Sequence, residues 1–274
     1  MPKRLAFFGP HGTHTEQASL NYDGEAVLLP YSTIPLVAAA VDSGEADEGV
    51  VPIENSVGGS LSVTLDLLIH GSSLFIRQEI ILPIKHFLVG RPGTRFEDID
   101  IIYSHHQALE QCRSYLAEHF DGVREVLSTS TASAVEDMLT GDGRAAAIAT
   151  ERAAKLYDAE VLASGIADYS NNTTRFVVLA SADHPPTGDD KTSICFTFDG
   201  DNPGVLHSAL GELASRNINL TKIESRPTRV ALGEYIFLVD LQGHREDETV
   251  KSALSSLREI ATIFKIFGSY PRSS

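Results

Sequence analysis

The sequence has 274 residues, of which 42% are hydrophobic and 22% charged, and its formal net charge is −15. This composition is typical of a globular protein, and the negative charge argues against nucleic acid or an anionic membrane surface as the main partner. It does not exclude a small anionic substrate, because local charges and dipoles set the field inside a binding site.

Short β-like runs alternate with helical stretches through the first two thirds of the chain. We predict buried strands at residues 4–9, 48–52, 99–104, 124–128 and 145–149. Apolar residues recur at helical spacing within residues 61–68 and 109–120. This alternation indicates a largely parallel sheet covered by helices on both faces. Residues 78–90 differ, because two extended runs flank Pro83 without a helix, and we expect the chain to cross there from one lobe to another.

A change in pattern follows residues 181–190, where paired prolines, a glycine and acidic residues cannot hold a helix or a central strand. We therefore divide the chain into a domain at residues 1–182, a linker at 183–190 and a second domain at 191–274. The second domain reads β-α-β-β-α-β, which is the ferredoxin-like split arrangement. Its predicted strands are 192–198, 218–226, 234–241 and 262–268, and its predicted helices are 204–216 and 247–259.

The cysteine content and the apolar runs bear on where the protein works. Cys112 and Cys195 are too few and too far apart for a disulfide framework or a cysteine-rich metal site. The longest apolar run, residues 36–41, is far below the length that spans a membrane. No signal sequence is recognisable at the N-terminus. We expect a cytoplasmic protein.

Five segments before the linker share one design, in which a strand end is followed by a turn rich in Gly, Ser, Thr or Asn and then by a helix. Helix N-termini carry unpaired N–H groups and the positive end of the helix dipole, so they bind carboxylates and phosphates without lysine. Each polar residue could instead simply cap its helix. Five such turns, with Arg175 in the last, favour an anion site at the carboxyl edge of the strands. The segments are residues 9–15, 54–59, 104–108, 128–133 and, less clearly, 171–176.

His11, His14 and Glu16 offer a metal site as the alternative for the first turn. Metal catalysis needs three or four ligands from distinct places, and a further ligand is not evident in the sequence. The adjacent His105 and His106 would diverge on a regular helix or strand. The sequence also lacks a Walker A loop, a G-x-S-x-G motif and a G-x-G-x-x-G motif. These patterns favour an anion-binding turn over a metal site or a dinucleotide-binding loop.

Beyond these patterns, five strings occur in order: GPxGTxTxxA, VPIENSxGG, SHxQAxxQC, STASA and NNTTRF. Together they resemble the catalytic domain of prephenate dehydratase, and the second domain resembles an ACT domain. The resemblance extends from residue 4 to about residue 270. It implies an α/β fold, with a two-lobed catalytic domain like type II periplasmic binding proteins and a ferredoxin-like ACT domain. It also implies conversion of prephenate to phenylpyruvate, water and CO2 in the cleft between the lobes, without a cofactor.

The resemblance assigns roles to individual residues. Thr174 is the leading catalytic residue, as a hydrogen-bond donor to the departing hydroxyl, because a threonine hydroxyl is a poor acid. Glu54 is the second: it supplies or relays the proton if the cleft raises its pKa, or else caps its own turn. Arg175 holds one carboxylate, with a structural salt bridge as the alternative. The other candidate substrate-binding residues, each with a cap or structural hydrogen bond as the alternative, are Thr13, Asn55, Ser56, Ser104, Gln111, Ser130 and Thr131.

An effector site for phenylalanine is implied in the second domain, generally shared between two ACT domains. A helix start and a strand end are the alternatives for its glycine and its proline. We expect feedback inhibition through this site, in a homodimer or homotetramer, with no nucleic-acid or membrane partner. The residues implied are Gly204, Val205, Leu206, Glu224, Ser225, Arg226 and Pro227.

Two rival functions stay open at this point. One is arogenate dehydratase, which uses the same fold on the amino-acid analogue, and the other is a non-catalytic sensor with a binding cleft joined to an ACT domain. A chorismate mutase domain ahead of the first strand is not expected, since that strand begins at Arg4. His14 falls where the family commonly has an aromatic residue, so we expect it to pack or to line the cleft. The carboxylate that leaves as CO2 is expected to have a less stabilising environment than the other.

Overall fold

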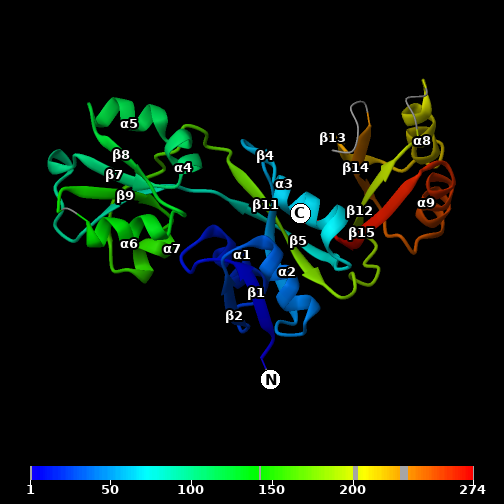
Figure 1. The fold of residues 1–274 in the computed structure, drawn as a ribbon, viewed down its shortest axis with the longest axis horizontal. Helices are drawn as coiled ribbons and strands as arrows, with labels where there is room; N and C mark the ends of the chain where they lie inside the picture. Colours follow the sequence, from blue (N-terminus) through cyan, green and yellow to red (C-terminus); the bar gives the residue numbers. More distant parts are fainter. Residues whose placement is uncertain (1, 142, 200–202, 229–233, 274) are drawn as a thin grey trace.

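A computed structural model describes residues 2–141, 143–199, 203–228 and 234–273 of the chain. These residues form three sheets with their helices, arranged as two lobes and a C-terminal domain (Figure 1). The first lobe lies in the middle, between the second lobe and the C-terminal domain (Figure 1). Within the described part of the chain, no helix is both long and apolar enough to cross a membrane.

The first lobe has a sheet of order β2-β1-β3-β11-β5, with β4 paired to β3. Strand β1 is parallel to β2 and β3, whereas β11 is antiparallel to both of its neighbours. The sheet is therefore mixed rather than largely parallel, because the chain leaves this lobe after β5 and returns to it in β11. The strands are β1 (Arg4–Phe8), β2 (Val27–Tyr31), β3 (Glu48–Asn55), β4 (Gly59–Ser60), β5 (Phe75–Pro83) and β11 (Thr173–Ala180). The helices are α1 (His14–Tyr22), α2 (Ile34–Asp42), α3 (Ser62–Asp66) and the π-helical turn η1 (Leu67–Gly71).

The second lobe has a sheet of order β10-β6-β9-β7-β8. The helix predicted over residues 109–120 is two helices, because Cys112 leaves the helical conformation at φ −115° and ψ 15°. The carbonyl of Gln111 there accepts a hydrogen bond of 2.7 Å from the N–H of Asp168, outside the helix. The strands are β6 (Phe87–Gly90), β7 (Ile101–Ser104), β8 (Arg124–Leu127), β9 (Ala145–Ala149) and β10 (Glu160–Ser164). The helices are α4 (His106–Gln111), α5 (Arg113–His119), α6 (Ser133–Thr140), α7 (Glu151–Leu156) and the 3-10 turn η2 (Phe96–Asp98).

The chain crosses between the lobes twice, at residues 84–86 and at residues 165–172. The first crossing is the one predicted around Pro83, and the second was not predicted. The two crossing segments are hydrogen-bonded to each other, since the N–H of Ile84 donates to the carbonyl of Asn172 at 2.8 Å. The hinge between the lobes is therefore a pair of hydrogen-bonded segments rather than two independent linkers.

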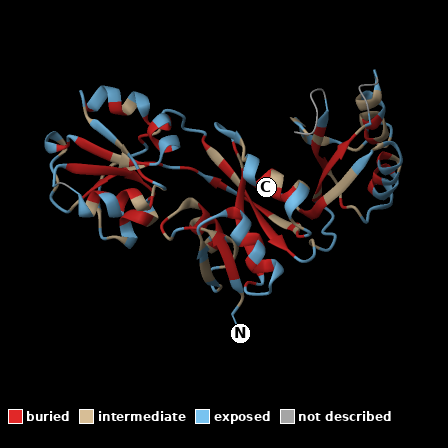
Figure 2. Ribbon diagram, viewed as in Figure 1, coloured by how far each residue is buried: buried red, intermediate tan, exposed pale blue. Residues whose placement is uncertain are grey.

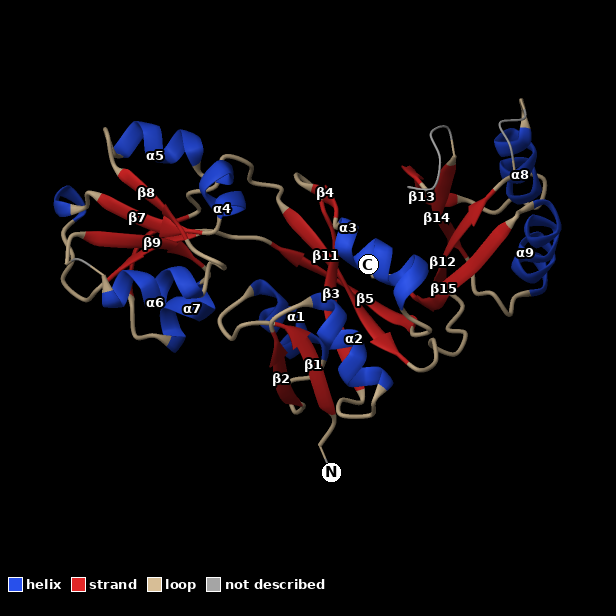
Figure 3. Cartoon of the chain, in the orientation of Figure 1, coloured by secondary structure: helices blue, strands red, loops and turns tan. Residues whose placement is uncertain are grey.

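The C-terminal domain has the predicted β-α-β-β-α-β order and a sheet of order β13-β14-β12-β15 (Figure 3). Its two helices cover one face of the sheet, and the opposite face packs on the first lobe. Gly268 in β15 permits this approach, because a Cβ there would lie 2.2 Å from the carbonyl oxygen of Ile76 in β5. The elements are β12 (Asp190–Thr197), α8 (Val205–Ala214), β13 (Leu220–Pro227), β14 (Tyr235–Gln242), α9 (Glu248–Ile260) and β15 (Ile263–Pro271).

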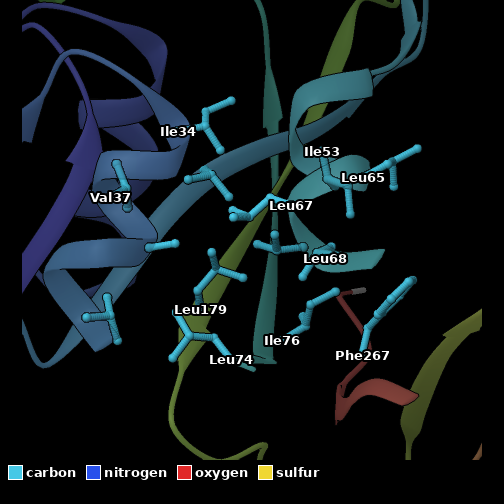
Figure 4. Close-up of a cluster of buried hydrophobic side chains, with 14 of the residues drawn as sticks. Ile34, Val37, Ile53, Leu65, Leu67, Leu68, Leu74, Ile76, Leu179 and Phe267 are labelled. Carbon is cyan, nitrogen blue, oxygen red and sulfur yellow. The ribbon is translucent and has the colours of Figure 1, made fainter. Parts of the chain in front are cut away.

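The largest shared core joins the first lobe to the C-terminal domain. Phe267 from β15 lies beside Ile76 and Leu68 of the first lobe (Figure 4). Most strand residues at the centres of the three sheets are buried (Figure 2). Because the two bodies share this apolar core, the C-terminal domain and the first lobe are held as one unit.

Candidate active site

A cavity of about 820 Å³ lies between the two lobes. Its walls combine turns that end strands of both sheets, and all five of the turns singled out in the sequence contribute lining residues. Thr13, Asn55, Gln111, Ser130, Thr131 and Thr174 are the candidate residues that line it. Ser56, Ser104, Glu54 and Arg175 are candidates that lie outside its described lining.

The turn before α1 forms one wall of the cavity. Thr13 is the N-cap of this helix and accepts a hydrogen bond from the backbone N–H of Glu16. Gly12, at φ +84°, sits so close to the second lobe that a Cβ would lie 3.2 Å from Ala132 and Ala153. Thr150 of the second lobe donates to the carbonyl of Gly12 at 2.5 Å. Gly12 thus allows the first lobe to touch the second.

The buried carboxylate of Glu16 stabilises the same contact between the two lobes. Its carboxylate accepts hydrogen bonds from Arg152 of the second lobe, from the N–H of Gly12 at 2.8 Å, and lies 2.6 Å from Nδ1 of His11. Burial opposes ionisation of Glu16, but these partners outweigh it and lower the pKa to about 2. His11 and Glu16 are thus engaged in an ion-pair cluster. Among the described residues, no group of three His, Cys, Asp or Glu side chains is arranged to hold a metal ion.

Asn55 and Thr174 lie opposite each other on β3 and β11. The Oδ1 atom of Asn55 accepts from the N–H groups of Val57 and Gly58, at 3.0 and 2.8 Å, which fixes the direction of its amide. The Nδ2 atom of Asn55 therefore donates, and it lies 2.9 Å from Oγ1 of Thr174. Because Oγ1 accepts this bond, the hydroxyl hydrogen of Thr174 is left for a group in the cavity.

Two buried histidines stand in the cavity wall. Burial lowers the pKa of His14 to about 3, with a smaller contribution from His86, and burial also lowers the pKa of His86 itself. Both rings are therefore neutral at pH 7. Nε2 of His14 and Nδ1 of His86 are buried without a hydrogen-bond partner in the protein. The expectation that His14 lines the cleft agrees with its place in the structure, whereas His86 was not predicted.

The turn before α6 forms the facing wall. Ser130 and Ser133 bond each other through side chain and backbone, with the N–H of Ser130 donating to Oγ of Ser133 at 2.8 Å. Glu136, one helical turn farther along α6, lines the cavity and accepts a hydrogen bond from the hydroxyl of Tyr157. Sequence analysis missed Glu136, although it lies three residues after Ser133 and so shares a helix face with it.

Ser104 and Ser56 have structural hydrogen bonds in place of cavity contacts. Ser104 is fully buried, and its hydroxyl donates to the carbonyl of Ile148 at 2.7 Å. The hydroxyl of Ser56 donates to the carbonyl of Asn171 at 3.2 Å and accepts from the N–H of Thr173 at 2.9 Å. The alternative stated for both residues, a structural hydrogen bond, matches these positions.

Arg175 points away from the cavity, towards the C-terminal domain. Its guanidinium contacts the carboxylates of Glu79 and Asp240, at 2.8 and 2.6 Å, and the hydroxyl of Tyr270 at 2.6 Å. Burial alone would lower the pKa of Arg175, but these neighbours outweigh it and raise the pKa. The substrate-binding expectation for Arg175 is therefore corrected: Thr174 faces the cavity, and alternation along a strand sends the next side chain to the opposite face.

Glu54 shows the same alternation beside Asn55. Its carboxylate lies 3.1 Å from Nζ of Lys222 in β13 and 3.7 Å from the guanidinium of Arg175. Glu54 lies outside the described lining of the cavity, and these ion pairs engage its carboxylate on the opposite face of β3. This arrangement does not support the proton relay expected of Glu54, which stays a prediction.

The candidate effector residues lie at the start of α8 and along β13. Gly204 is the N-cap of α8 at φ +87°, directly before Val205 and Leu206. Glu224 accepts a hydrogen bond of 2.6 Å from Ser60 of the first lobe, and Arg226 lies 3.3 Å from Asp66 of the same lobe. Ser225 lies between them, with its backbone facing Phe237 of β14. Arg226 and Pro227 also line a second cavity, of about 470 Å³, between the C-terminal domain and the first lobe.

Comparisons with known proteins agree with this geometry. A family model described as prephenate dehydratase matches residues 5–184, and one described as ACT domain matches residues 200–259. A bifunctional chorismate mutase/prephenate dehydratase of Aquifex aeolicus is 43% identical over 271 residues, which cover 98% of this chain and 74% of that protein.

Two solved structures resemble the whole chain. Prephenate dehydratase from Arthrobacter aurescens, in complex with L-Phe, superimposes with a TM-score of 0.90 at 38% identity, covering 98% of this chain and 90% of that one. GqqA, described as a novel type of quorum quenching acylase, superimposes with a TM-score of 0.88 at 31% identity, covering 99% and 98%.

Proposed function

The chain belongs to the prephenate dehydratase family and carries an ACT domain, and from this premise we propose how its cavity performs the reaction and how the reaction is regulated. Prephenate is a dianion that loses one carboxylate as CO2 and its ring hydroxyl as water, with uptake of one proton. The product is the phenylpyruvate monoanion. Aromatisation of the ring drives the reaction, so the protein has to hold the dianion and help the hydroxyl leave.

The observation that carries the mechanism is the direction of the bond between Asn55 and Thr174. Asn55 donates to Oγ1 of Thr174 at 2.9 Å, so the hydroxyl of Thr174 can donate its own hydrogen to the departing oxygen. This donor is oriented before substrate arrives and requires no reorganisation in the transition state. Loss of one such preorganised donor typically lowers kcat by ~10²–10³-fold.

The dianion is held without a lysine or arginine among the described lining residues. Thr13, at the start of α1, and Ser130 and Thr131, just before α6, bring the positive ends of two helices to the cavity. Gln111 adds a neutral donor. Strong binding of both carboxylates would stabilise the substrate as much as the transition state and would not speed the reaction. Helix dipoles directed at the pyruvyl carboxylate leave the carboxylate that is lost as CO2 without such stabilisation.

Proton delivery is assigned to Glu136, which takes the place expected for Glu54. Glu136 is the acidic side chain among the described residues of the lining, and Tyr157 holds its carboxyl group. In its protonated form, this carboxyl group is the carboxylic acid available within the described lining. Glu136 then supplies the proton that converts the departing hydroxyl into water, and proton donation of this kind contributes ~10²–10⁴-fold.

We assign feedback regulation by L-phenylalanine to the ACT domain, with Gly204–Leu206 and Glu224–Pro227 as its effector segments. The family relative from Arthrobacter aurescens was solved with L-Phe. In this chain, Glu224 and Lys222 form one cluster with Ser60 and Glu54, with contacts of 2.6 to 3.2 Å. Glu54 directly precedes Asn55. A change at Glu224 is thus transmitted to the residue that orients Thr174.

The assembly and the location of the protein are proposals as well. A homodimer or homotetramer is expected, because the effector segments are implied to be shared between two ACT domains. A cytoplasmic location is supported by Cys112 and Cys195, which are both buried and unpaired. Sedimentation velocity with and without L-phenylalanine measures the assembly, and a monomer under both conditions would contradict it.

The deciding experiment supplies purified full-length protein with prephenate or arogenate and measures phenylpyruvate or phenylalanine, each with and without L-phenylalanine. We expect phenylpyruvate from prephenate, and inhibition by L-phenylalanine. A preference for arogenate would show that arogenate, not prephenate, is the substrate. Binding of either compound without turnover would favour a non-catalytic sensor. Hydrolysis of an acylated homoserine lactone, tested in parallel, would point instead to the acylase activity described for one structural relative.

A further inference from the structure

A chain of buried hydrogen bonds continues from Asn55 across the hinge into the second lobe. Nδ2 of Asn55 lies 2.7 Å from Oδ1 of Asn172, and Nδ2 of Asn172 lies 3.0 Å from Oε1 of Gln111. Nε2 of His86 lies 2.8 Å from the same Oε1. Asn172 and His86 are only 2% and 3% exposed, so their polar atoms depend on these bonds.

The direction of each bond follows from the fixed end at Asn55. Two backbone N–H groups hold its Oδ1, so its Nδ2 donates, and the oxygen of Asn172 must accept. The Nδ2 of Asn172 is then the donor to Oε1 of Gln111. Since Oε1 is an acceptor, the second atom that bonds it has to carry a hydrogen, which places the proton of the neutral His86 ring on Nε2.

Two consequences appear at the cavity. Oε1 of Gln111 is occupied by two donors, so the NH2 group is the end of this side chain left to donate to a substrate. Reversal of the Gln111 amide would face its NH2 group with the NH2 group of Asn172 and present an oxygen to an anion. We propose that Asn172 and His86 are positioning residues, which hold the Gln111 amide with its NH2 group directed at a carboxylate of the bound substrate.

The chain also joins the two lobes. Asn55 and Asn172 belong to β3 and to the returning crossing segment, Gln111 ends α4 of the second lobe, and His86 ends the first crossing segment. The backbones follow the same path, because Ile84 bonds Asn172 at 2.8 Å and Asp168 bonds Gln111 at 2.7 Å. The same hydrogen bonds therefore fix both the hinge between the lobes and the direction of the Gln111 NH2 group. In this arrangement of the lobes, Gln111 is already oriented.

This inference rests on the proposed function, because it assigns a partner in the substrate to Gln111, but its first test needs no turnover. In full-length protein labelled with ¹⁵N-histidine, a long-range ¹H–¹⁵N correlation spectrum at pH 7.5 identifies the tautomer of each ring. The His86 signal is assigned by its disappearance in His86→Gln. We expect neutral His86 with its proton on Nε2. A neutral ring with its proton on Nδ1 and none on Nε2 would overturn the bond directions and with them the proposal.

The second test separates a positioning role from a packing role by kinetics with prephenate. His86→Leu removes the Nε2 donor, and we expect KM to rise at least ~10-fold while kcat changes less than ~3-fold. His86→Gln places an N–H near the position of Nε2 and should bring KM back to within ~3-fold of the wild-type value. An unchanged KM in His86→Leu, or equal KM values in the Leu and Gln variants, would overturn the proposal.

Asn172→Asp provides an independent arm, and decides the matter if His86→Leu does not fold. It keeps an acceptor for Asn55 but faces Gln111 with an oxygen, so KM should rise by a similar factor, and an unchanged KM would overturn the proposal. If wild-type protein fails to turn over prephenate, the proposed function fails. Two measurements then decide the positioning role separately. One is the His86 tautomer by NMR, and the other is calorimetry of prephenate binding to wild-type and His86→Leu protein.

Discussion

Replacement of Arg175 by methionine tests whether this residue joins the two domains or binds the substrate. In the structure, its guanidinium contacts Glu79 and Asp240, and its side chain is 11% exposed. Without it, Lys191 still pairs with Glu79 at 2.8 Å, and Ser193 still donates to Asp240 at 2.5 Å. Removal of one partner from a buried ion pair costs ~3–5 kcal/mol, and the remaining contacts favour the lower end, ~3 kcal/mol.

Urea unfolding followed by far-UV circular dichroism measures this loss as a lower midpoint at unchanged slope. The pH dependence of stability provides a second test of the ion pair between Arg175 and Asp240. Burial opposes ionisation of Asp240, but Arg175 outweighs it and lowers the pKa of the carboxyl group. This stabilisation is present above the unfolded pKa and lost as the pH falls through the folded one. In Arg175→Met, burial favours the protonated acid, so the difference in stability from wild type should narrow as the pH is lowered from 7.

The double variant Arg175→Met/Asp240→Leu is the matched control, because it leaves no unpaired carboxylate at that place. It should be more stable than Arg175→Met by at least ~1 kcal/mol, which is a coupling energy typical of residues in contact. A loss below ~1 kcal/mol in Arg175→Met, together with a rise of KM for prephenate above ~100-fold, would refute this reasoning. Arg175 would then be a substrate ligand, as the sequence suggested.

Three further predictions concern the other charged clusters. Glu54→Gln should leave the pH dependence of kcat unchanged and Glu136→Gln should alter it; a shift only in Glu54→Gln would return the proton relay to Glu54. Lys222→Met should raise the L-phenylalanine concentration for half inhibition at least ~5-fold, while uninhibited kcat stays within ~3-fold, and unchanged inhibition would remove Lys222 from the coupling. Wild-type protein should lose stability as Glu16 is protonated between pH 4.5 and about 2, and Glu16→Gln should have a shallower acid limb in unfolding experiments. Identical acid limbs would contradict the role of Glu16.

The sequence predicted the fold well where one element determines its own periodicity. The β-α-β-β-α-β order of the C-terminal domain and the crossing near Pro83 follow from runs of alternating or helical spacing. The return crossing at residues 165–172 was missed, because nothing local distinguishes a polar loop within one lobe from one that joins two. The mixed sheet of the first lobe depends on that return, so it was missed as well.

The sequence correctly indicated the turns that form the candidate site. It did not indicate which of two neighbouring strand residues faces the cavity. Glu54 and Asn55 are neighbours on β3, and Thr174 and Arg175 are neighbours on β11, so each pair must split between two faces. Which member faces the cavity depends on the position of the C-terminal domain, and sequence alone does not provide it. Thus the acid and the base of these pairs face the C-terminal domain, and the amide and the hydroxyl face the cavity.

His86 and Asn172 could not be predicted for a different reason. His86 lies alone in its segment and Asn172 is one of several polar residues in the 171–176 turn, while their partner Gln111 is 25 and 61 residues away in the sequence. Only the meeting of the two crossing segments brings these side chains together. A buried hydrogen-bond chain of this kind is a property of tertiary structure, and no local pattern encodes it.

The central claim is that the Thr174 hydroxyl, oriented by Asn55, donates to the departing oxygen. Steady-state turnover of prephenate by Thr174→Ala and Thr174→Ser tests it most directly, because serine keeps the hydroxyl and alanine removes it. The account predicts that alanine lowers kcat by ~10²–10³-fold with KM changed less than ~5-fold, and that serine retains most of the activity. Turnover by Thr174→Ala within ~5-fold of wild type would contradict it.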